Sequence, residues 1–226
     1  MIDQFQIGPL RNFVYLVTFG GESLVVDPQP ELAPWERRLA ELGARLCGVL
    51  LTHTHHDHVG GVPEICEKYG VPVYVHALDE GRLTGKAGLG LPRREVEASG
   101  DRIASRLHRI VDGDRIAVGN CFVEVLHTPG HSGGECSYLV QESAKGPSGL
   151  FSGDTVFVGD VGRTDLETGS NEEMFATIQR LKTLPPDTVI YPGHDYGRTP
   201  TSTIARESAQ SAAWRCKSVE ELAALP

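Results

Sequence analysis

The sequence predicts an α/β (α+β) fold in which helices cover both faces of β-sheet layers. Short apolar runs with strand character alternate along the chain with amphipathic helical segments, and some neighbouring strands lie close enough to form hairpins. The chain has 226 residues, 40% of them hydrophobic, which suffices for a sizeable core. Because no repeat and no long linker divides it, we predict a single domain over residues 1–226, with short C-terminal helices.

The first predicted elements are a hairpin and a helix. Residues 13–17 and 23–26 are β-type runs on either side of Gly20-Gly21, which is typical of two strands joined by a tight turn. Residues 34–42 carry a helical pattern, with proline in the first turn and Gly43 as the stop signal.

A second group of elements surrounds a histidine-rich segment. Residues 46–51 form a nearly continuous apolar run, which is typical of a strand buried on both faces. A helix over 62–69 and a strand over 71–75 follow. Residues 79–108 are polar and contain glycine, so we expect short helix and loop that cover the site.

The rest of the chain continues the alternation. A helix begins at Asn171, because Met174, Ile178 and Leu181 share one face, and Pro185-Pro186 ends it. The other predicted elements are a turn at 112–114, strands at 121–126, 137–140, 150–152 and 188–191, a polar loop tip at 143–148, and C-terminal helices at about 202–213 and 218–225.

The composition of the chain indicates which kinds of binding partner and which cellular compartment to expect. The net charge is −9 and no basic run is present, which argues against a nucleic acid or an anionic membrane surface as the main partner. The N-terminus lacks the pattern of a signal peptide, and no apolar stretch is long enough to span a bilayer. Oligomeric state is left open, a homodimer included. The five cysteines contain no CxxC pair, so we predict a reduced, cytoplasmic protein without a disulfide framework.

Four potential metal ligands lie within six residues, directly after the apolar run at 46–51. They are His53, His55, Asp57 and His58. Side chains alternate along an extended chain, so His53 and His55 should face the same side, and a turn would let Asp57 and His58 face a neighbouring point. Imidazole and carboxylate groups suit zinc, iron or manganese. The segment therefore predicts metal binding, with two ions close together.

Three further candidate ligands each follow a predicted strand and stand beside a glycine. They are His131, Asp154 and His194. Loops at sheet edges bring such residues together, so we expect all three near the first cluster. His56 should point away from it. His127 is either a hydrogen-bonding partner of the site or a structural residue, while we expect His76 and His108 to be structural.

The segment Thr52-His53-Thr54-His55-His56-Asp57-His58-Val59-Gly60-Gly61, with His131, Asp154 and His194, resembles the metallo-β-lactamase superfamily. The resemblance implies a four-layer αβ/βα sandwich of two mixed β-sheets flanked by helices, with metals at one edge of the sheets. It further implies two ligand groups. His53, His55 and His131 would surround one metal, Asp57, His58 and His194 would surround the second, and Asp154 would bridge them.

Motifs favour the hydrolase branch of that superfamily. True β-lactamases of this fold mostly supply cysteine where this chain has Asp154. Residues 8–13, 127–132 and 151–157 resemble glyoxalase II, the hydroxyacylglutathione hydrolase, whereas residues 162–165, 191–196 and 202–204 look at least as much like persulfide dioxygenase. A nuclease is disfavoured by the acidic balance of the chain. Glutathione specificity is open, because few basic residues follow His194: Arg198, Arg206, Arg215 and Lys217.

Two enzyme hypotheses use the same residues. In a thioester hydrolase, two divalent ions, most simply Zn²⁺ with iron or manganese as alternatives, lower the pKa of a shared water. Asp57 and Asp154 are then the candidate catalytic residues, and Arg163 and Tyr196 the candidate substrate-binding residues. In a persulfide dioxygenase, resemblance assigns a single Fe²⁺ to His53, His131 and Asp154, with glutathione persulfide as the substrate. A non-catalytic metal-binding protein is the third, least favoured reading.

Overall fold

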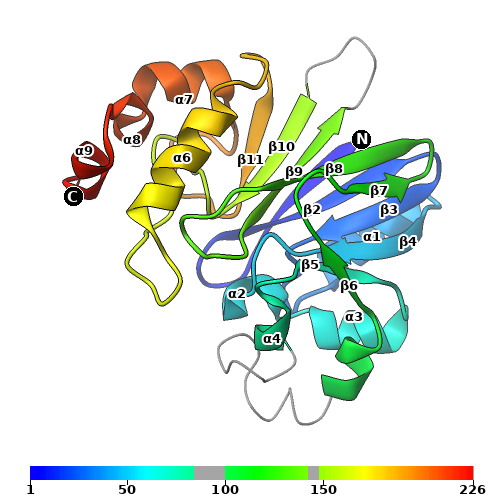
Figure 1. Ribbon diagram of the computed structural model, residues 1–226. Helices are drawn as coiled ribbons and strands as arrows, with labels where there is room; N and C mark the ends of the chain where they lie inside the picture. The colour runs from blue at the N-terminus through cyan, green and yellow to red at the C-terminus, as the bar shows by residue number, and fades with distance from the viewer. Residues whose placement is uncertain (84–99, 142–147, 226) are drawn as a thin grey trace.

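Two six-stranded sheets lie face to face in the part of the chain that the computed structural model describes, residues 1–83, 100–141 and 148–225 (Figure 1). The first sheet has the order β1-β2-β3-β4-β5-β6, and the second has the order β12-β11-β10-β9-β8-β7. Each sheet thus follows the order of the chain, the second in reverse, which agrees with the tendency of sequential strands to be neighbours.

Both sheets mix parallel and antiparallel pairs. The strands of the first sheet are β1 (Ile2–Ile7), β2 (Asn12–Phe19), β3 (Glu22–Val26), β4 (Arg45–Leu50), β5 (Val73–His76) and β6 (Leu107–Ile110). The β1–β2 and β2–β3 pairs are antiparallel, and the next three pairs are parallel. The strands of the second sheet are β7 (Arg115–Val118), β8 (Cys121–His127), β9 (Cys136–Gln141), β10 (Ser148–Gly153), β11 (Val189–Pro192) and β12 (Ser202–Thr203). Here only β10–β11 is parallel.

Helices cover the outer face of each sheet (Figure 1). Against the first sheet lie α1 (Ala33–Glu41) and α3 (Val62–Lys68), and against the second lies α6 (Asn171–Leu181), followed by α7 (Ile204–Gln210), α8 (Ala212–Arg215) and α9 (Val219–Ala223). Two short helices, α2 (His56–Val59) and α4 (Glu80–Leu83), lie beyond the ends of β4 and β5.

Three separate hydrophobic clusters fill the spaces between the four layers. One joins the first sheet to α1 and α3, one lies between the sheets, and one joins the second sheet to α6–α9. Strand β2 contributes to two of them, because Val14 and Leu16 point to the helices while Tyr15 and Val17 point to the facing sheet. This alternation explains why residues 13–17 of the strand are all apolar. The predicted four-layer sandwich of two mixed sheets flanked by helices is therefore confirmed.

Most predicted elements appear within one or two residues of their expected bounds, but weak signals were missed. The insertion at 79–108 was expected to be helix and loop, yet β6 begins at Leu107 and pairs with β5. This edge strand is held by backbone pairing and has two exposed side chains, so it lacks a long apolar run. Strands β1, β7 and β12 were not predicted. Residues 84–99 of the insertion, and 143–147 of the predicted loop tip, lie outside the described residues.

The predicted C-terminal helix at 202–213 is two helices preceded by a short strand. Thr203 and Ser211 are both extended, and their side chains accept hydrogen bonds from Arg206 N and Trp214 N. Each residue therefore caps a new helix, as serine and threonine commonly do.

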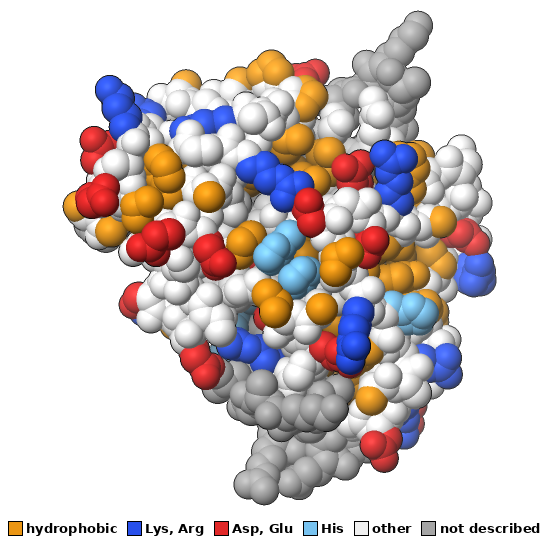
Figure 2. Space-filling model, in the orientation of Figure 1, with side chains coloured by type: hydrophobic (Ala, Val, Ile, Leu, Met, Phe, Trp, Pro, Cys, Tyr) orange, Lys and Arg blue, Asp and Glu red, His pale blue; other side chains and the backbone are white. Residues whose placement is uncertain are grey.

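None of the described helices has the length and apolar character needed to cross a membrane. Acidic and basic side chains are interspersed over the face shown in Figure 2.

Candidate metal centre

Four strand ends bring the predicted ligands to one place. The segment 53–58 follows β4, His131 follows β8, Asp154 follows β10, and His194 follows β11. Every one of these residues comes directly after the C-terminal end of its strand or a few residues beyond it. The two sheets therefore present their ligands at a common edge, as the sequence predicted.

The first group of ligand atoms consists of three imidazoles, from His53, His55 and His131, which lie close enough to hold one ion. Nδ1 of His55 lies 3.0 Å from Nε2 of His53 and 2.9 Å from Nε2 of His131. His53 and His131 are buried. The segment 51–55 is not part of a strand, but His55 is extended, so the alternation that we expected still places both rings on one side.

The second group combines Asp57, His58 and His194, which again lie close enough to hold one ion. Nε2 of His58 is 3.2 Å from Nε2 of His194, and Oδ2 of Asp57 is 3.4 Å from the same His194 atom. Helix α2 makes this possible, since its single turn directs Asp57 and His58 to a different point from His53 and His55.

Asp154 lies between the two groups and directs one oxygen to each. Its Oδ1 is 3.4 Å from Nε2 of both His58 and His194, whereas its Oδ2 is 3.6 Å from Nε2 of His131. Oδ1 is buried and has no hydrogen-bond partner among the described residues. Although burial opposes ionisation, His58 and His194 hold the pKa of Asp154 well below its usual value. A carboxylate in this position fits a bridge between two cations.

Hydrogen bonds at the outer side of the rings fix which nitrogen faces the centre. Nδ1 of His131 donates to the carbonyl of Arg163 at 2.8 Å, and Nδ1 of His194 donates to the carbonyl of Leu10 at 2.9 Å. Nδ1 of His58 donates to Asp27 at 3.0 Å. With the proton on Nδ1, each Nε2 presents a lone pair inward.

Once His58 has lost its second proton, the inner surface of the site consists of acceptors. Imidazole nitrogens 2.9–3.2 Å apart repel each other unless a cation or a proton lies between them. The pKa values of the metal-free protein reflect this. Burial, with His131 close by, lowers the pKa of His55 to about 4. Burial also opposes a charge on His58, but Asp154, Asp27 and Asp57 outweigh it and raise the pKa of His58 to about 10. The residues present fit divalent metal ions.

Asp27 holds the histidine segment in place through hydrogen bonds, and sequence reasoning missed this residue. It follows β3 with a positive φ of 49° and is buried. Its Oδ1 accepts a hydrogen bond from Thr52 N at 2.8 Å, and its Oδ2 accepts one from Thr52 Oγ1 at 2.6 Å, in addition to that of His58. The Val-Val-Asp-Pro context was the available signal, because an aspartate after a buried strand and before proline resembles the other ligand-bearing strand ends.

Asn12 and Gln29 hold the Asp57 end of the same segment. Nδ2 of Asn12 donates to the carbonyl of Asp57 at 2.9 Å and to its Oδ2 at 3.1 Å. Nε2 of Gln29 donates to the same carbonyl. Although burial opposes ionisation, His58 and the bond from Asn12 lower the pKa of Asp57. The short helix α2 is thus anchored through its own backbone and through one of its candidate ligands.

Glycines beside the ligands are explained by close packing. A Cβ on Gly193 would lie 2.4 Å from Oδ1 of Asp154, and one on Gly162 would lie 1.9 Å from the Asp154 carbonyl. Gly153 has a φ of 51°, and a Cβ there would lie 2.4 Å from Oγ1 of Thr52. The pairing of glycine with each strand-end ligand, noted in the sequence, therefore has a steric cause at these positions.

The two predicted substrate-binding residues lie beside the ligands without belonging to them. The backbone of Arg163 accepts the bond from His131, while its guanidinium makes two bonds of 2.6 and 2.7 Å to Asp165. Tyr196 stacks on His194 with ring centroids 4.6 Å apart and an interplanar angle of 10°. Tyr196 also contacts Phe157, with ring centroids 5.2 Å apart, and 53% of it is exposed next to the second ligand group.

The other histidines agree with their predicted places. The side chain of His56 is 72% exposed and belongs to neither ligand group, as expected. His127 stacks on His76 with centroids 4.2 Å apart, and its Nε2 bonds the carbonyl of Gly133 at 2.9 Å. This bond reaches the loop that carries His131, so the role left open for His127 is that of a residue supporting the loop. His108 is exposed and packs beside Tyr74.

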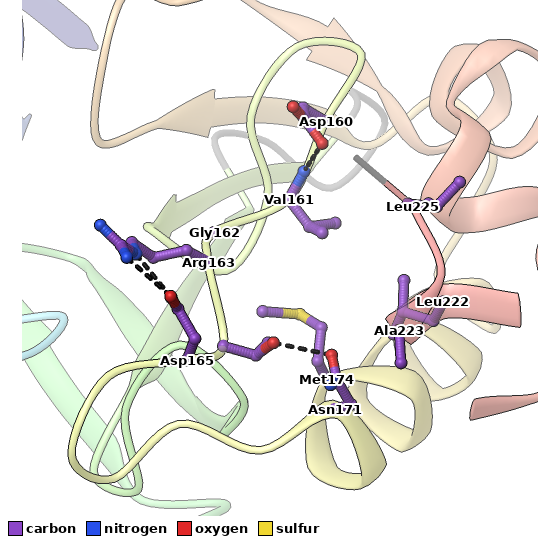
Figure 3. A pocket seen from close by; sticks show the side chains of 11 residues that line it. Asp160, Val161, Gly162, Arg163, Asp165, Asn171, Met174, Leu222, Ala223 and Leu225 are labelled. Carbon is purple, nitrogen blue, oxygen red and sulfur yellow. Dashed lines mark hydrogen bonds and ion pairs between the residues drawn. The ribbon is translucent and has the colours of Figure 1, made fainter. Parts of the chain in front are cut away.

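A cleft of about 460 Å³ is lined by residues 160–165, by residues of α6 and α9, and by Leu225 (Figure 3). Its floor is apolar, with Met174, Leu222 and Leu225, and Arg163 and Asp165 lie paired at its rim. None of the candidate metal ligands lines it. Arg163 links this cleft to the metal centre, because its backbone carbonyl accepts the hydrogen bond of His131.

Comparisons of sequence place this site among known proteins. The sequence profile of the metallo-beta-lactamase superfamily matches residues 7–194. The chain is 33% identical over 192 residues to the probable metallo-hydrolase YqgX of Bacillus subtilis, covering 83% of this chain and 87% of that protein. It is 37% identical over 185 residues to a hydroxyacylglutathione hydrolase of Aeromonas hydrophila, covering 82% of this chain but 61% of that protein.

Comparison with solved structures agrees with the sequence comparisons. A metallo-beta-lactamase from Staphylococcus aureus superposes with a TM-score of 0.82 at 30% identity, covering 100% of this chain and 67% of the other. ETHE1 from Myxococcus xanthus gives 0.78 at 26% identity, covering 100% and 92%. The protein TTHA1623, solved in a di-iron-bound form, gives 0.75 at 32% identity, covering 92% and 98%.

Proposed function

This chain belongs to the metallo-beta-lactamase superfamily, and from that premise we propose that it is a metal-dependent hydrolase that cleaves thioesters of the hydroxyacylglutathione type. The observation that carries the proposal is the position of Asp154, whose two oxygens face two complete groups of ligand atoms. A site for two ions suits hydrolysis, in which a water must be activated near neutral pH.

The residues divide the work of this reaction. When bound, two divalent cations lower the pKa of a shared water and polarise the thioester carbonyl. His53, His55 and His131 would hold one cation, and Asp57, His58 and His194 the other. Asp154 fixes the distance between the two groups. Asp57, kept in place by Asn12, presents a carboxylate that can accept the proton of the attacking water. Because a thiolate is a good leaving group, no strong general acid is needed.

The residues at the border of the site would contact the substrate. We assign the exposed ring of Tyr196 to an apolar part of the substrate, because it extends the surface of His194 outward. Arg163 is assigned to a substrate carboxylate, for which it would exchange its exposed partner Asp165. Replacing Arg163 by alanine is then expected to raise KM and leave kcat nearly unchanged, measured in the steady state with a carboxylate-bearing thioester.

A persulfide dioxygenase is the alternative function. It is supported by the similarity to ETHE1 and by the proximity of His131 to Asp154, two members of the expected His-His-carboxylate set. The hydrolase is favoured because the second ligand group is equally complete and equally buried, which a reaction at a single iron does not require. The similarity to a di-iron-bound protein supports two metals and keeps iron beside zinc as a candidate.

One set of measurements tests the proposal. Protein purified without added metal is analysed for zinc, iron and manganese, and is then assayed with S-lactoylglutathione and, separately, with glutathione persulfide in an oxygen electrode. We expect about two metal ions per chain and thioester hydrolysis, both reduced in Asp154→Asn. One iron per chain with persulfide-dependent oxygen uptake and no hydrolysis would replace the hydrolase by the dioxygenase. Full activity in Asp154→Asn would contradict the ligand assignment itself.

A further inference from the structure

Glu135 is a fully buried acid that contacts two candidate metal ligands without belonging to either ligand group. It lies directly before β9, four residues after His131 in the chain. Its side chain and that of His53 are both completely inaccessible to solvent. Such a position is unusual for glutamate, which is rarely buried unless it is paired.

The contacts of Glu135 join two separate ligand segments. Its Oε1 accepts a hydrogen bond from the backbone N–H of Asp154 at 2.9 Å. The same oxygen lies 3.5 Å from Nδ1 of His53, a nitrogen that is also 3.1 Å from Thr52 Oγ1. Because Thr52 Oγ1 gives its own proton to Asp27, it accepts at His53, and Glu135 adds a second acceptor on the same side of the ring.

Packing leaves the carboxyl group no freedom to move away. A Cβ on Gly153 would lie 2.6 Å from Oε1 of Glu135, so the turn before Asp154 lies directly on the carboxyl group. The backbone around Glu135 is also tied to the site, because its carbonyl accepts a bond from Thr128 N at 2.9 Å, and Cys136 N donates to the Thr52 carbonyl at 2.8 Å. The side chain is therefore fixed between the segments that carry His53 and Asp154.

Stability alone does not account for this residue. Its Oε2 is buried without a hydrogen-bond partner among the described residues. An unpaired buried acceptor is costly, and an apolar side chain of similar volume would avoid that cost. A glutamate at this position is thus explained by what Oε1 does at Asp154 and His53.

We infer that Glu135 is a positioning residue of the metal centre, which fixes Asp154 and His53 relative to each other and keeps Nε2 of His53 directed at the ion. Partners of this kind around a ligand commonly contribute 10–100-fold to metal affinity. The inference rests on the proposed metal centre but not on the proposed substrate.

The chain offers a matched control in Glu207. This glutamate is also buried, and it also accepts a backbone N–H, from Gly159 at 2.9 Å, together with the hydroxyl of Ser202. It contacts none of the candidate ligands in any of its hydrogen bonds. Glu135→Gln and Glu135→Met are therefore compared with Glu207→Gln and Glu207→Met. All four remove a buried carboxyl group, but only the first pair does so beside the metal centre.

The readouts are metal affinity, by competition with a chromophoric chelator for Zn²⁺, and the visible absorption spectrum of the Co²⁺-substituted protein. We expect Glu135→Met to bind its metal 10–100-fold more weakly than the wild type and to change the Co²⁺ spectrum. Glu135→Gln keeps an acceptor for Asp154 N, so its metal affinity should lie between that of Glu135→Met and that of the wild type. The Glu207 variants should stay within about twofold of the wild type and keep its spectrum.

The outcomes separate this inference from the proposed function. Wild-type affinity and an unchanged spectrum in both Glu135 variants would overturn the role of Glu135, while the metal centre itself stands. Absence of metal from the wild type would overturn the metal centre first. Where Glu135→Met does not fold, the comparison of Glu135→Gln with Glu207→Gln decides, and equal metal affinities in that pair count against the inference.

Discussion

Nδ1 of His58 donates a hydrogen bond of 3.0 Å to Oδ2 of Asp27, and both side chains are buried. The same carboxylate holds Thr52, which immediately precedes the first candidate ligand. Asp27 therefore acts on both ends of the segment 53–58. It sets the tautomer of one ligand, and it also fixes the point at which the segment leaves β4. Both groups of candidate ligands thus depend on a residue that belongs to neither group.

Replacing Asp27 by asparagine should reverse the direction of the bond at His58. Asparagine can keep Oδ1 for Thr52 N, but its NH₂ group would then face Nδ1 of His58 and favour a proton on Nε2, where the metal should bind. Asparagine also tolerates positive φ, so the backbone is preserved. We expect metal affinity to fall about 10–100-fold. Chelator competition measures this.

The control for this variant is Asp114→Asn, which changes a turn carboxylate that accepts Val111 N at 2.9 Å. It should bind metal like the wild type. Equal metal affinities in the two variants would show that the Asp27–His58 bond does not set the tautomer of the ligand.

Alanine variants of Gly153 and Gly43 distinguish the energetic cost of backbone strain from the cost of overpacking. Both have positive φ, 51° and 58°, but a Cβ on Gly43 meets nothing within 4 Å, whereas one on Gly153 would collide with Thr52 and Glu135. Gly43→Ala should reduce the free energy of unfolding by about 1 kcal/mol through backbone strain alone. Gly153→Ala should lose a further ~1–3 kcal/mol from overpacking and release metal as Asp154 shifts. Urea denaturation with metal analysis tests this, and equal losses in the two variants would contradict the packing argument.

Most of the site could be predicted from the sequence because its candidate ligands occur in short, recognisable motifs. The cluster 53–58 and the strand-end residues His131, Asp154 and His194 all stand next to glycines or turns that are visible in the sequence. The apolar runs before them could be assigned to buried strands by their length alone. Residue type and context were therefore enough to select all seven candidate ligands, which the structure places in one cluster.

Supporting residues could not be found in the same way, because their roles arise from tertiary contacts. Glu135 reads as a polar residue in a loop, and only the packing of the 153–154 turn shows that it is buried. The edge strand β6 was missed for a related reason. Backbone pairing with β5 holds it in place, and only its two end residues, Leu107 and Ile110, are apolar, which is too short a pattern to indicate a strand. Sequence patterns report burial of long elements well and report such pairing poorly.

Protonation of His58 should make two properties of the metal-free protein depend on pH: its free energy of unfolding and its apparent affinity for metal. Its pKa of about 10 in the metal-free fold lies above the ordinary value of 6.5. The contribution of His58 to stability is therefore fully present below pH 6.5 and is lost as the pH rises through about 10. Metal must displace this proton, so apparent affinity should rise about tenfold per pH unit for each proton released.

Calorimetric titration of the metal-free protein in buffers of different ionisation enthalpy measures the released proton between pH 7 and 9. Thermal unfolding of the metal-free protein over the same range should show falling stability, and His58→Ala should remove that trend. Metal binding without proton release would mean that His58 is already neutral before the ion arrives.

The stacked pair of His76 and His127 should give the fold a separate sensitivity to acid. Burial lowers the pKa of His76, and the neighbouring His127 lowers it further, while Asp112 acts in the opposite direction. A base whose pKa is depressed by folding binds more protons in the unfolded state, so the stability it contributes is present above pH 6.5 and is lost as the pH falls. His76→Phe keeps an aromatic ring against His127 but cannot titrate. Its free energy of unfolding, measured in urea, should therefore fall less than that of the wild type between pH 7 and 5. His108→Phe, which changes an exposed histidine, should follow the wild type, and parallel pH profiles for all three proteins would exclude the stacked pair as the acid-sensitive element.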